Sequence, residues 1–275
     1  RTFFFEAYTI PTGSMEGTML INDYLFVSKL AYGPRVPMTP LAIPLVHNTM
    51  PFTGGKSYTD AVQWKYHRIP GFGHVERNDV VVFNYPCGDT IITDHPNDDY
   101  YVNCRRYGRE TILNSTPVST RPIDKKDNYI KRCVAIPGDV LEIKNARVYI
   151  NGQPNQLYPH SKLGYHVKTN NGTPPAIEDN IEMMQIIRQG EYIINLENDQ
   201  VDLVKKAPNV SLVEAFIQFG PGIPPQDPAE WVFPHDTANF KWNKDNFGPM
   251  TIPKEGVTVQ LNPQNIAPVS YTHLR

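Results

Sequence analysis

The chain has 275 residues, and its 26 lysine and arginine residues nearly balance its 28 aspartate and glutamate residues. The net charge of −2 gives no strong field that would attract nucleic acid or an anionic surface. A hydrophobic share of 40% excludes a disordered chain, and 26 prolines, about twice the usual roughly 5%, exclude a fold of long helices. No apolar run reaches the roughly 18 residues of a membrane-spanning helix. Since the sequence starts with Arg1, it reads as part of a longer protein.

Strand signals dominate the first 150 residues. β-branched and aromatic residues gather in five runs, which predict strands at Tyr24–Lys29, Asp79–Tyr85, Tyr129–Ile136, Val140–Lys144 and Ala146–Ile150. Pro137-Gly138-Asp139 and Asn151-Gly152 are turn signals that separate or follow these strands. We therefore expect a mostly β core over residues 1–152.

Two segments of different character interrupt this core. Residues 36–74 are rich in proline and aromatics, and residues 87–127 are polar with one predicted helix near Tyr100–Leu113. Both are interpreted as insertions between strands that pair in space. Residues 153–268 are predicted to form a smaller α+β accessory region. It would hold a helix at Ile177–Arg188, a strand at Glu191–Asn195 and a helix near Gln200–Lys206.

Cysteine and histidine spacing gives little support for a metal or a disulfide framework. Three cysteines are an odd count, so free thiols are favoured, although Cys87 pairing with Cys104 stays open. The histidines form no His-x-x-x-His pair and the cysteines no Cys-x-x-Cys pair, so a zinc site has little support. The cluster of Asp94, His95, Asp98 and Asp99 favours a solvated turn over a calcium site.

Two short segments carry groups that suit nucleophilic catalysis. Ser14 follows Thr12 and Gly13 in a loop, and Lys131 lies on a predicted strand, on the same face as Cys133 and Ala135. Burial of that face disfavours the charged ammonium form, and a neutral lysine amine is a base that can activate serine. The Thr12 hydroxyl and the Ser14 backbone N–H would form an oxyanion hole.

Simpler interpretations of the same residues stay open from spacing alone. Ser14 in a Pro-Thr-Gly-Ser loop is typical of a turn residue, and Lys131 beside Arg132 is typical of an exposed edge strand. A triad of Ser14, His95 and Asp94 is disfavoured, because adjacent residues on an extended chain point in opposite directions.

Four motifs in the same order resemble the type I signal peptidases, the bacterial leader peptidases with a serine–lysine dyad. The first motif, Pro-Ser-Gly-Ser-Met in the family, appears as Pro11-Thr12-Gly13-Ser14-Met15, with threonine for the first serine. The second, Gly-Asp followed by apolar residues, appears from Asn22-Asp23 onward, and the third, Arg-Gly-Asp-Ile-Val-Val-Phe, appears as Arg77-Asn78-Asp79-Val80-Val81-Val82-Phe83. The lysine motif appears as Tyr129-Ile130-Lys131-Arg132 and then Pro137-Gly138-Asp139. The long insertions and Tyr107-Gly108-Arg109-Glu110 resemble members from the Bacteroidetes group.

The resemblance implies a signal-peptidase/LexA-like β-fold and a serine endopeptidase that cleaves signal peptides from exported preproteins. Ser14 would be the nucleophile, Lys131 the general base, and Thr12 with Ser14 the oxyanion hole. Tyr8, Ile10, Tyr129 and Ile130 match positions that line the substrate cleft. This cleft accepts an Ala-x-Ala-type site because small pockets exclude larger side chains. The implied location is the outer, periplasmic side of the cytoplasmic membrane, with secretory preproteins and membrane lipid as partners and no nucleic acid. The resemblance implies no metal and no organic cofactor.

Two departures from the family pattern concern the chain ends. The family has a spanning helix before the first motif, which we expect upstream of Arg1, where Phe3, Phe4 and Phe5 would flank it. The family also has a late Gly-Asp-Asn-Arg…Ser-x-Asp-Ser-Arg motif that packs against the lysine, and this sequence lacks it. Without that motif, water would reach Lys131, so we expect the chain to have feeble activity. Residues 269–275 match a one-frame translation of a common sequencing adapter, so we expect them to be a non-native tail.

Two alternatives to a signal peptidase are carried forward. A LexA-like self-cleaving protease uses the same dyad but carries a DNA-binding segment ahead of its core. A non-catalytic periplasmic β-rich binding domain would need neither Ser14 nor Lys131. The aromatics Phe3–Phe5, Trp64, Tyr66 and Phe72 favour a membrane flank, and the alternative is that they are ordinary core residues.

Overall fold

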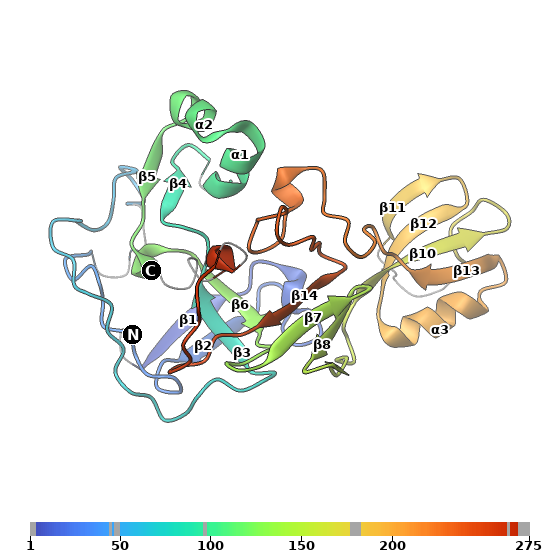
Figure 1. Ribbon diagram of the computed structural model, residues 1–275, viewed down its shortest axis with the longest axis horizontal. Coiled ribbons are helices and arrows are strands. Elements are labelled where there is room, and N and C mark those ends of the chain that lie inside the picture. The colour runs from blue at the N-terminus through green and yellow to red at the C-terminus, as the bar shows by residue number, and fades with distance from the viewer. Residues whose placement is uncertain are drawn as a thin grey trace. The chain divides into compact units, whose positions relative to one another are not determined.

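The structure is a computed structural model that describes residues 4–43, 46, 50–95, 98–176, 183–262 and 265–268. The chain forms two compact units. Unit 1 comprises Arg1–Met15, Ile21–Ile136 and Gln226–Glu230, and unit 2 comprises Glu16–Leu20, Pro137–Pro225 and Trp231–Arg275. Antiparallel sheets make up most of the regular structure, so the mostly β prediction is confirmed (Figure 1). The prediction of a core at 1–152 and an accessory region at 153–268 stays a prediction.

Unit 1 is built from three antiparallel strand pairs. β1 (Phe5–Thr9) pairs with β2 (Tyr24–Ser28), and β3 (Val80–Asn84) pairs with β6 (Asn128–Arg132). The third pair is β4 (Thr90–Ile92) with β5 (Val118–Thr120). The strands predicted from the sequence thus form, although β6 ends at Arg132, four residues before the predicted Ile136.

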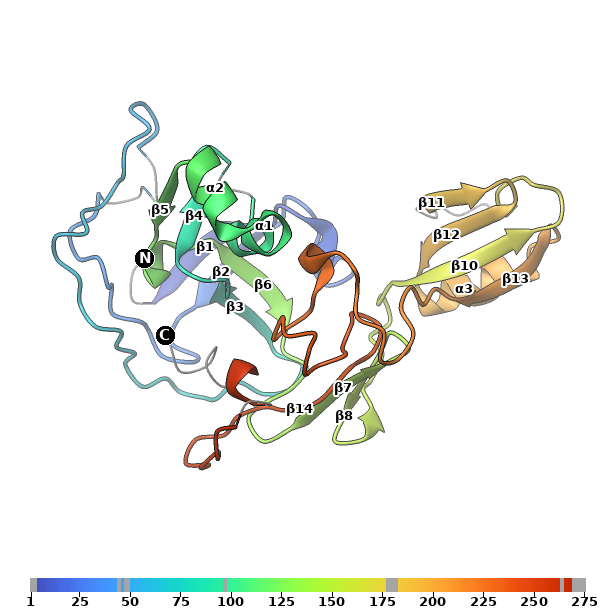
Figure 2. The same cartoon turned by 45° about the horizontal axis from the view of Figure 1, so that its top comes forward.

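The second predicted insertion lies between paired strands, as expected. It carries α1 (Tyr100–Tyr107), α2 (Arg109–Ser115) and the 3₁₀ helix η2 (Ile123–Lys125), and it starts and ends at the β3–β6 pair. Figures 1 and 2 show α1 and α2 beside β4 and β5. Three buried side chains hold this subdomain together: Ile92, Tyr100 and Ile112. The helix predicted near Tyr100–Leu113 is therefore confirmed, with a break at Gly108, whose φ of 89° lies outside the helical region.

The first predicted insertion differs from its prediction in one respect. It follows β2 and precedes β3, but within the described residues these two strands pair with β1 and β6 rather than with each other. Asp124 of η2 anchors the segment instead, because its Oδ2 accepts hydrogen bonds from the backbone N–H groups of Met38 and Thr39 at 3.0 and 2.9 Å. A side-chain carboxylate thus accepts the hydrogen bonds of backbone N–H groups that lie outside the described strands.

Unit 2 contains two four-stranded sheets. One has the order β14–β7–β8–β9, formed by Phe247–Thr251, Val140–Lys144, Arg147–Ile150 and Gln153–Pro154. The other has the order β11–β12–β10–β13, formed by Met183–Arg188, Glu191–Leu196, Leu163–Thr169 and Val210–Ala215. The hairpins predicted around residues 140–152 are present, with Asn151 and Gly152 at positive φ in the turn.

The second sheet packs against α3 (Asn198–Lys206), which lies along it in Figure 1. Val201 and Val204 of α3 are buried with Val167, Ile194 and Leu196 of the strands. The predicted strand at Glu191–Asn195 and the predicted helix near Gln200–Lys206 are confirmed. The helix predicted at Ile177–Arg188 is wrong for residues 183–188, which form β11 through pairing with β12, while residues 177–182 lie outside the described residues. Hydrogen bonding to β12 therefore decides the structure of this apolar run, although its residue pattern also fits a helix.

Candidate active site

The loop that carries Ser14 is fixed at both of its flanks. It follows β1 directly, and the backbone of Ile10 exchanges hydrogen bonds with that of Asp23 and Asn22 at 3.0 and 2.8 Å. The Ile10 side chain is buried, and so is Met15 at the end of the 3₁₀ helix η1 (Gly13–Met15). Two buried apolar anchors thus bracket an exposed Ser14.

Two asparagines in the resembling motifs occupy left-handed backbone positions. Asn22 has φ of 72° and Asn78 has φ of 78°, at positions where the family motifs have glycine. After glycine, asparagine is the residue that tolerates this conformation best. Asparagine at these two positions is therefore compatible with the left-handed turns that precede β2 and β3.

Lys131 lies on β6 in register with Val81 of β3. Its half-buried side chain reaches the serine loop, and its Nζ donates a hydrogen bond to Ser14 Oγ at 2.5 Å. Thr12 Oγ1 lies 3.5 Å from the same Ser14 Oγ. The structure thus brings together a hydroxyl, an amine and a second hydroxyl, which is the group set that acyl transfer through serine requires.

The predicted cleft residues lie on the elements that carry this group. Tyr8, half-buried, is on β1, and Ile10 follows that strand; Tyr129 and Ile130 immediately precede Lys131 on β6. Tyr129 is 42% exposed, and its ring centroid lies 6.0 Å from Lys131 Nζ. Their role as cleft residues stays a prediction.

The acidic cluster near residue 95 and the three cysteines do not belong to this group of side chains. Asp99 is the N-cap of α1 and accepts hydrogen bonds from the N–H groups of Tyr101 and Val102 at 2.8 and 2.9 Å. Asp94 and His95 are exposed, and the hydrogen bond to the Ser14 hydroxyl comes from Lys131 rather than from His95. Among the described residues, no group of three or more His, Cys, Asp or Glu side chains is arranged to hold a metal ion. Cys87, Cys104 and Cys133 are free thiols, so the Cys87–Cys104 pairing left open by the sequence is not present.

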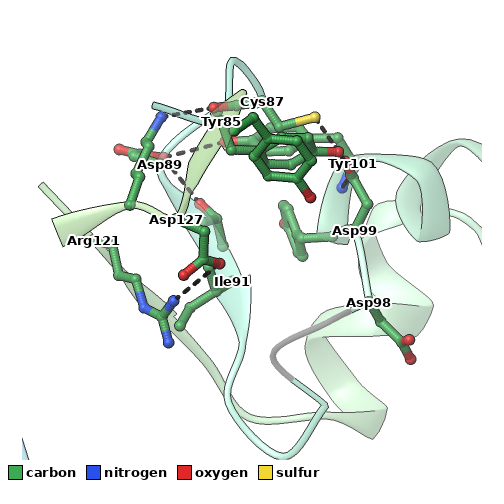
Figure 3. A pocket seen from close by; sticks show the side chains of 14 residues that line it. Tyr85, Cys87, Asp89, Ile91, Asp98, Asp99, Tyr101, Arg121 and Asp127 are labelled. Atoms are coloured by element: carbon green, nitrogen blue, oxygen red, sulfur yellow. Dashed lines mark hydrogen bonds and ion pairs between the residues drawn. The ribbon is translucent and has the colours of Figure 1, made fainter. Parts of the chain in front are cut away.

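Sequence reasoning missed a pocket in the second insertion. Tyr85 and Tyr129 stack with ring centroids 4.9 Å apart on one side of it, and Arg121 and Asp127 face each other on another (Figure 3). Tyr85 donates a hydrogen bond to Asp99, and burial with this bond raises the pKa of the Tyr85 hydroxyl well above its usual range. No sequence motif marks these residues, because they come from four separate stretches of chain.

Comparisons with known proteins match the chain to one family of peptidases. The profile of the family described as "Signal peptidase, peptidase S26" matches residues 1–202. The chain is 27% identical to a signal peptidase I of Pseudomonas aeruginosa over 56% of this chain and 32% of that protein. It is 25% identical to a signal peptidase I of Haemophilus influenzae, over 85% of this chain and 54% of that protein. It is 27% identical to a signal peptidase I of Helicobacter pylori, over 70% of this chain and 61% of that protein.

The chain thus spans about a third of the Pseudomonas aeruginosa relative and about half of the Haemophilus influenzae one. No solved structure matches it. Within the described residues, no helix is both long and apolar enough to cross a bilayer.

Proposed function

Because the chain belongs to the family described as "Signal peptidase, peptidase S26", we propose that it is a serine endopeptidase that cleaves signal peptides from exported preproteins. The observation that carries the proposal is the 2.5 Å contact between Lys131 Nζ and Ser14 Oγ. The family match favours this function over a LexA-like self-cleaving protease and over a non-catalytic binding domain.

In the proposed mechanism Lys131 acts in its neutral amine form. It accepts the proton of the Ser14 hydroxyl while Oγ attacks the carbonyl carbon of the scissile peptide bond. The negative charge that develops on the carbonyl oxygen is stabilised by the Ser14 backbone N–H and the Thr12 hydroxyl. The lysine ammonium then gives its proton to the leaving amine nitrogen. Water, activated by the same amine, hydrolyses the acyl-enzyme and releases Ser14.

The proposed substrate carries small residues at the first and third positions before the cut. Tyr8, Ile10, Tyr129 and Ile130 supply the apolar walls that exclude larger side chains there. A pocket that fits a methyl group rejects a bulkier side chain by steric clash, so a short Ala-x-Ala site is sufficient for recognition.

The proposed place of action is the outer surface of the cytoplasmic membrane. Large exposed aromatic side chains support it: Phe4 and Phe5 are 60% and 53% exposed, Trp64 is 52% exposed and Phe72 is 88% exposed. Phe3 lies outside the described residues. Amphipathic and aromatic rings are favoured at the lipid interface, so these side chains would contact the headgroup region.

A cleavage assay with enzyme in excess tests the proposed reaction, because single-turnover conditions make slow cleavage measurable. We expect the chain to cut a preprotein after its Ala-x-Ala site, with the product ends identified by mass spectrometry. Lys131→Ala and Lys131→Arg should each lower the rate by about 10⁴-fold or more, because nucleophile and base act as a unit and arginine keeps its proton. Lys205→Ala, an exposed lysine of α3, is the control. Substantial turnover by Lys131→Ala would refute the assignment.

A further inference from the structure

The pocket in the second insertion has a volume of about 310 Å³ and lies within unit 1 (Figure 3). This is the lower end of the size range of ligand-binding pockets in proteins, and it is large enough for a side chain with its flanking peptide groups. Its walls come from the segment between β3 and β6 and from Tyr129 of β6 itself.

The polar tips of the wall residues are already occupied by bonds within the protein. Tyr85 donates to Asp99 Oδ2 at 2.6 Å, and Cys87 Sγ donates to the same oxygen at 2.6 Å. Tyr101 OH donates to Asp89 Oδ1 at 3.1 Å. What these residues leave for a ligand is therefore the faces and edges of aromatic rings, together with the aliphatic side chain of Ile91.

Arg121 and Asp127 provide the polar groups with remaining bonding capacity. Their closest atoms, Arg121 Nη1 and Asp127 Oδ2, are 3.7 Å apart, which is too long for a hydrogen bond. The Arg121 side chain is nevertheless only 15% exposed, whereas that of Asp127 is 60% exposed. A half-buried guanidinium whose ion pair is this long keeps N–H donors that can bind a ligand. A peptide group meets both needs, because its C=O accepts from Arg121 and its N–H donates to Asp127.

The pocket adjoins the proposed catalytic pair through a single ring. Tyr129 stacks on Tyr85 at 4.9 Å, and the Tyr129 ring centroid is 6.0 Å from Lys131 Nζ, which contacts Ser14. An extended peptide rises about 3.3 Å per residue. A peptide held at Ser14 therefore reaches the pocket with a residue about two or more positions from the scissile bond.

We infer that this pocket is an extended substrate subsite that takes an aromatic side chain of the preprotein at a distance from the scissile bond. The inference rests on the proposed function, to which it adds a determinant of specificity. The lining also holds four carboxylates, those of Asp89, Asp98, Asp99 and Asp127, against the cations Arg121 and Lys126. Two of the carboxylates, Asp89 and Asp99, already accept hydrogen bonds from wall residues.

A peptide-binding experiment with the Ser14→Ala form tests the subsite without turnover. A parent peptide with an Ala-x-Ala site and alanine at all flanking positions is compared with a series that carries one phenylalanine, moved along those positions. Fluorescence anisotropy gives the Kd of each. We expect one position, two or more residues from the cut, at which phenylalanine tightens binding about 3- to 10-fold.

Two tyrosines of α1 provide matched variants for this gain in affinity. Tyr101→Ala should abolish the gain, whereas Tyr101→Phe, which keeps the ring and loses only the bond to Asp89, should retain it. Tyr107→Ala removes a tyrosine of the same helix that is 56% exposed and does not line the pocket, and it should also retain the gain. Arg121→Gln should weaken binding of the long peptides alike, and leave unchanged a peptide too short to reach the pocket.

The outcomes separate the subsite from the function. If the parent peptide binds and phenylalanine tightens binding at no position, or the gain survives Tyr101→Ala, the subsite is overturned and the proposed function stands. If the parent peptide itself does not bind, the proposed function is overturned together with the subsite.

Discussion

Lys131 and Ser14 are 117 positions apart in the chain, and the structure places their side-chain Nζ and Oγ atoms 2.5 Å from each other. The contact depends on two separate supports. The β3–β6 pair holds Lys131 in register with Val81, and the buried side chains of Ile10 and Met15 hold the serine loop. The proposed base and nucleophile, held on different elements in this way, need no large rearrangement before reaction.

Thr12 gives a prediction that tests the proposed oxyanion hole by itself. Thr12→Val removes the hydroxyl that lies 3.5 Å from Ser14 Oγ and keeps the side-chain shape. We expect kcat on an Ala-x-Ala peptide to fall about 100- to 1000-fold, which is typical for the loss of one oxyanion donor. Thr12→Ser restores the hydroxyl and should keep most of the activity. Equal rates for the valine and serine variants would exclude Thr12 as a donor.

Glu191 gives a prediction about pH and stability. A hydrogen bond from Arg188 at 2.6 Å, with Lys168 at 3.3 Å, lowers the pKa of the Glu191 carboxyl from 4.5 to about 2. His166 Nε2 also faces this carboxylate at 3.5 Å. Because the pKa is lower in the folded state, the stabilisation is complete above about pH 4.5 and is lost as pH falls toward about 2.

Urea unfolding measured between pH 2 and pH 7 tests whether the free energy of unfolding falls with pH as expected. Glu191→Gln should flatten the dependence of the free energy of unfolding on pH below about 4.5, because the titrating group is gone. Glu255→Gln, an exposed carboxylate of the same unit, should leave the curve unchanged. A steeper acid dependence in Glu191→Gln would contradict the assignment of the shift to the folded state.

The exposed aromatic residues of the first insertion lead to a prediction about lipid. Trp64 and Phe72 are 52% and 88% exposed, and we expect the chain to float with liposomes. The double variant Trp64→Ser with Phe72→Ser should float less. Tyr107→Ser, which removes an exposed ring elsewhere in unit 1, is the control. The absence of flotation with every lipid composition would count against the membrane surface as the place of action.

The residues of the candidate site could be proposed from the sequence because the motifs that carry them are local. Thr12, Ser14 and Lys131 each lie in a short segment whose residue types are restricted by chemistry. The β strands flanking them were also predictable, since runs such as Val80–Val82 have strong β preference. Asn22 and Asn78 stand where the family motifs have glycine. The structure accounts for asparagine at these positions, because both residues have positive φ angles.

Features that depend on long-range packing could not be predicted. Residues 183–188 are apolar enough to fit a helix, and only pairing with β12 makes them a strand. The pocket that Tyr85, Tyr129 and Arg121 line is formed by residues from separate stretches of the chain, and no spacing in the sequence relates them. The sequence also did not determine which strands pair with β2 and β3, because strand pairing is not encoded in either strand alone.

Covalent labelling by a serine-reactive acylating inhibitor tests the central claim most directly. Intact and peptide mass spectrometry would locate the adduct and give its rate of formation. The account predicts an adduct on Ser14, no adduct in Ser14→Ala, and labelling at least about 100-fold slower in Lys131→Ala, because only a neutral amine beside the hydroxyl activates it. An adduct on another residue, or a labelling rate in Lys131→Ala equal to that of the unmodified chain, would contradict the proposed serine–lysine pair.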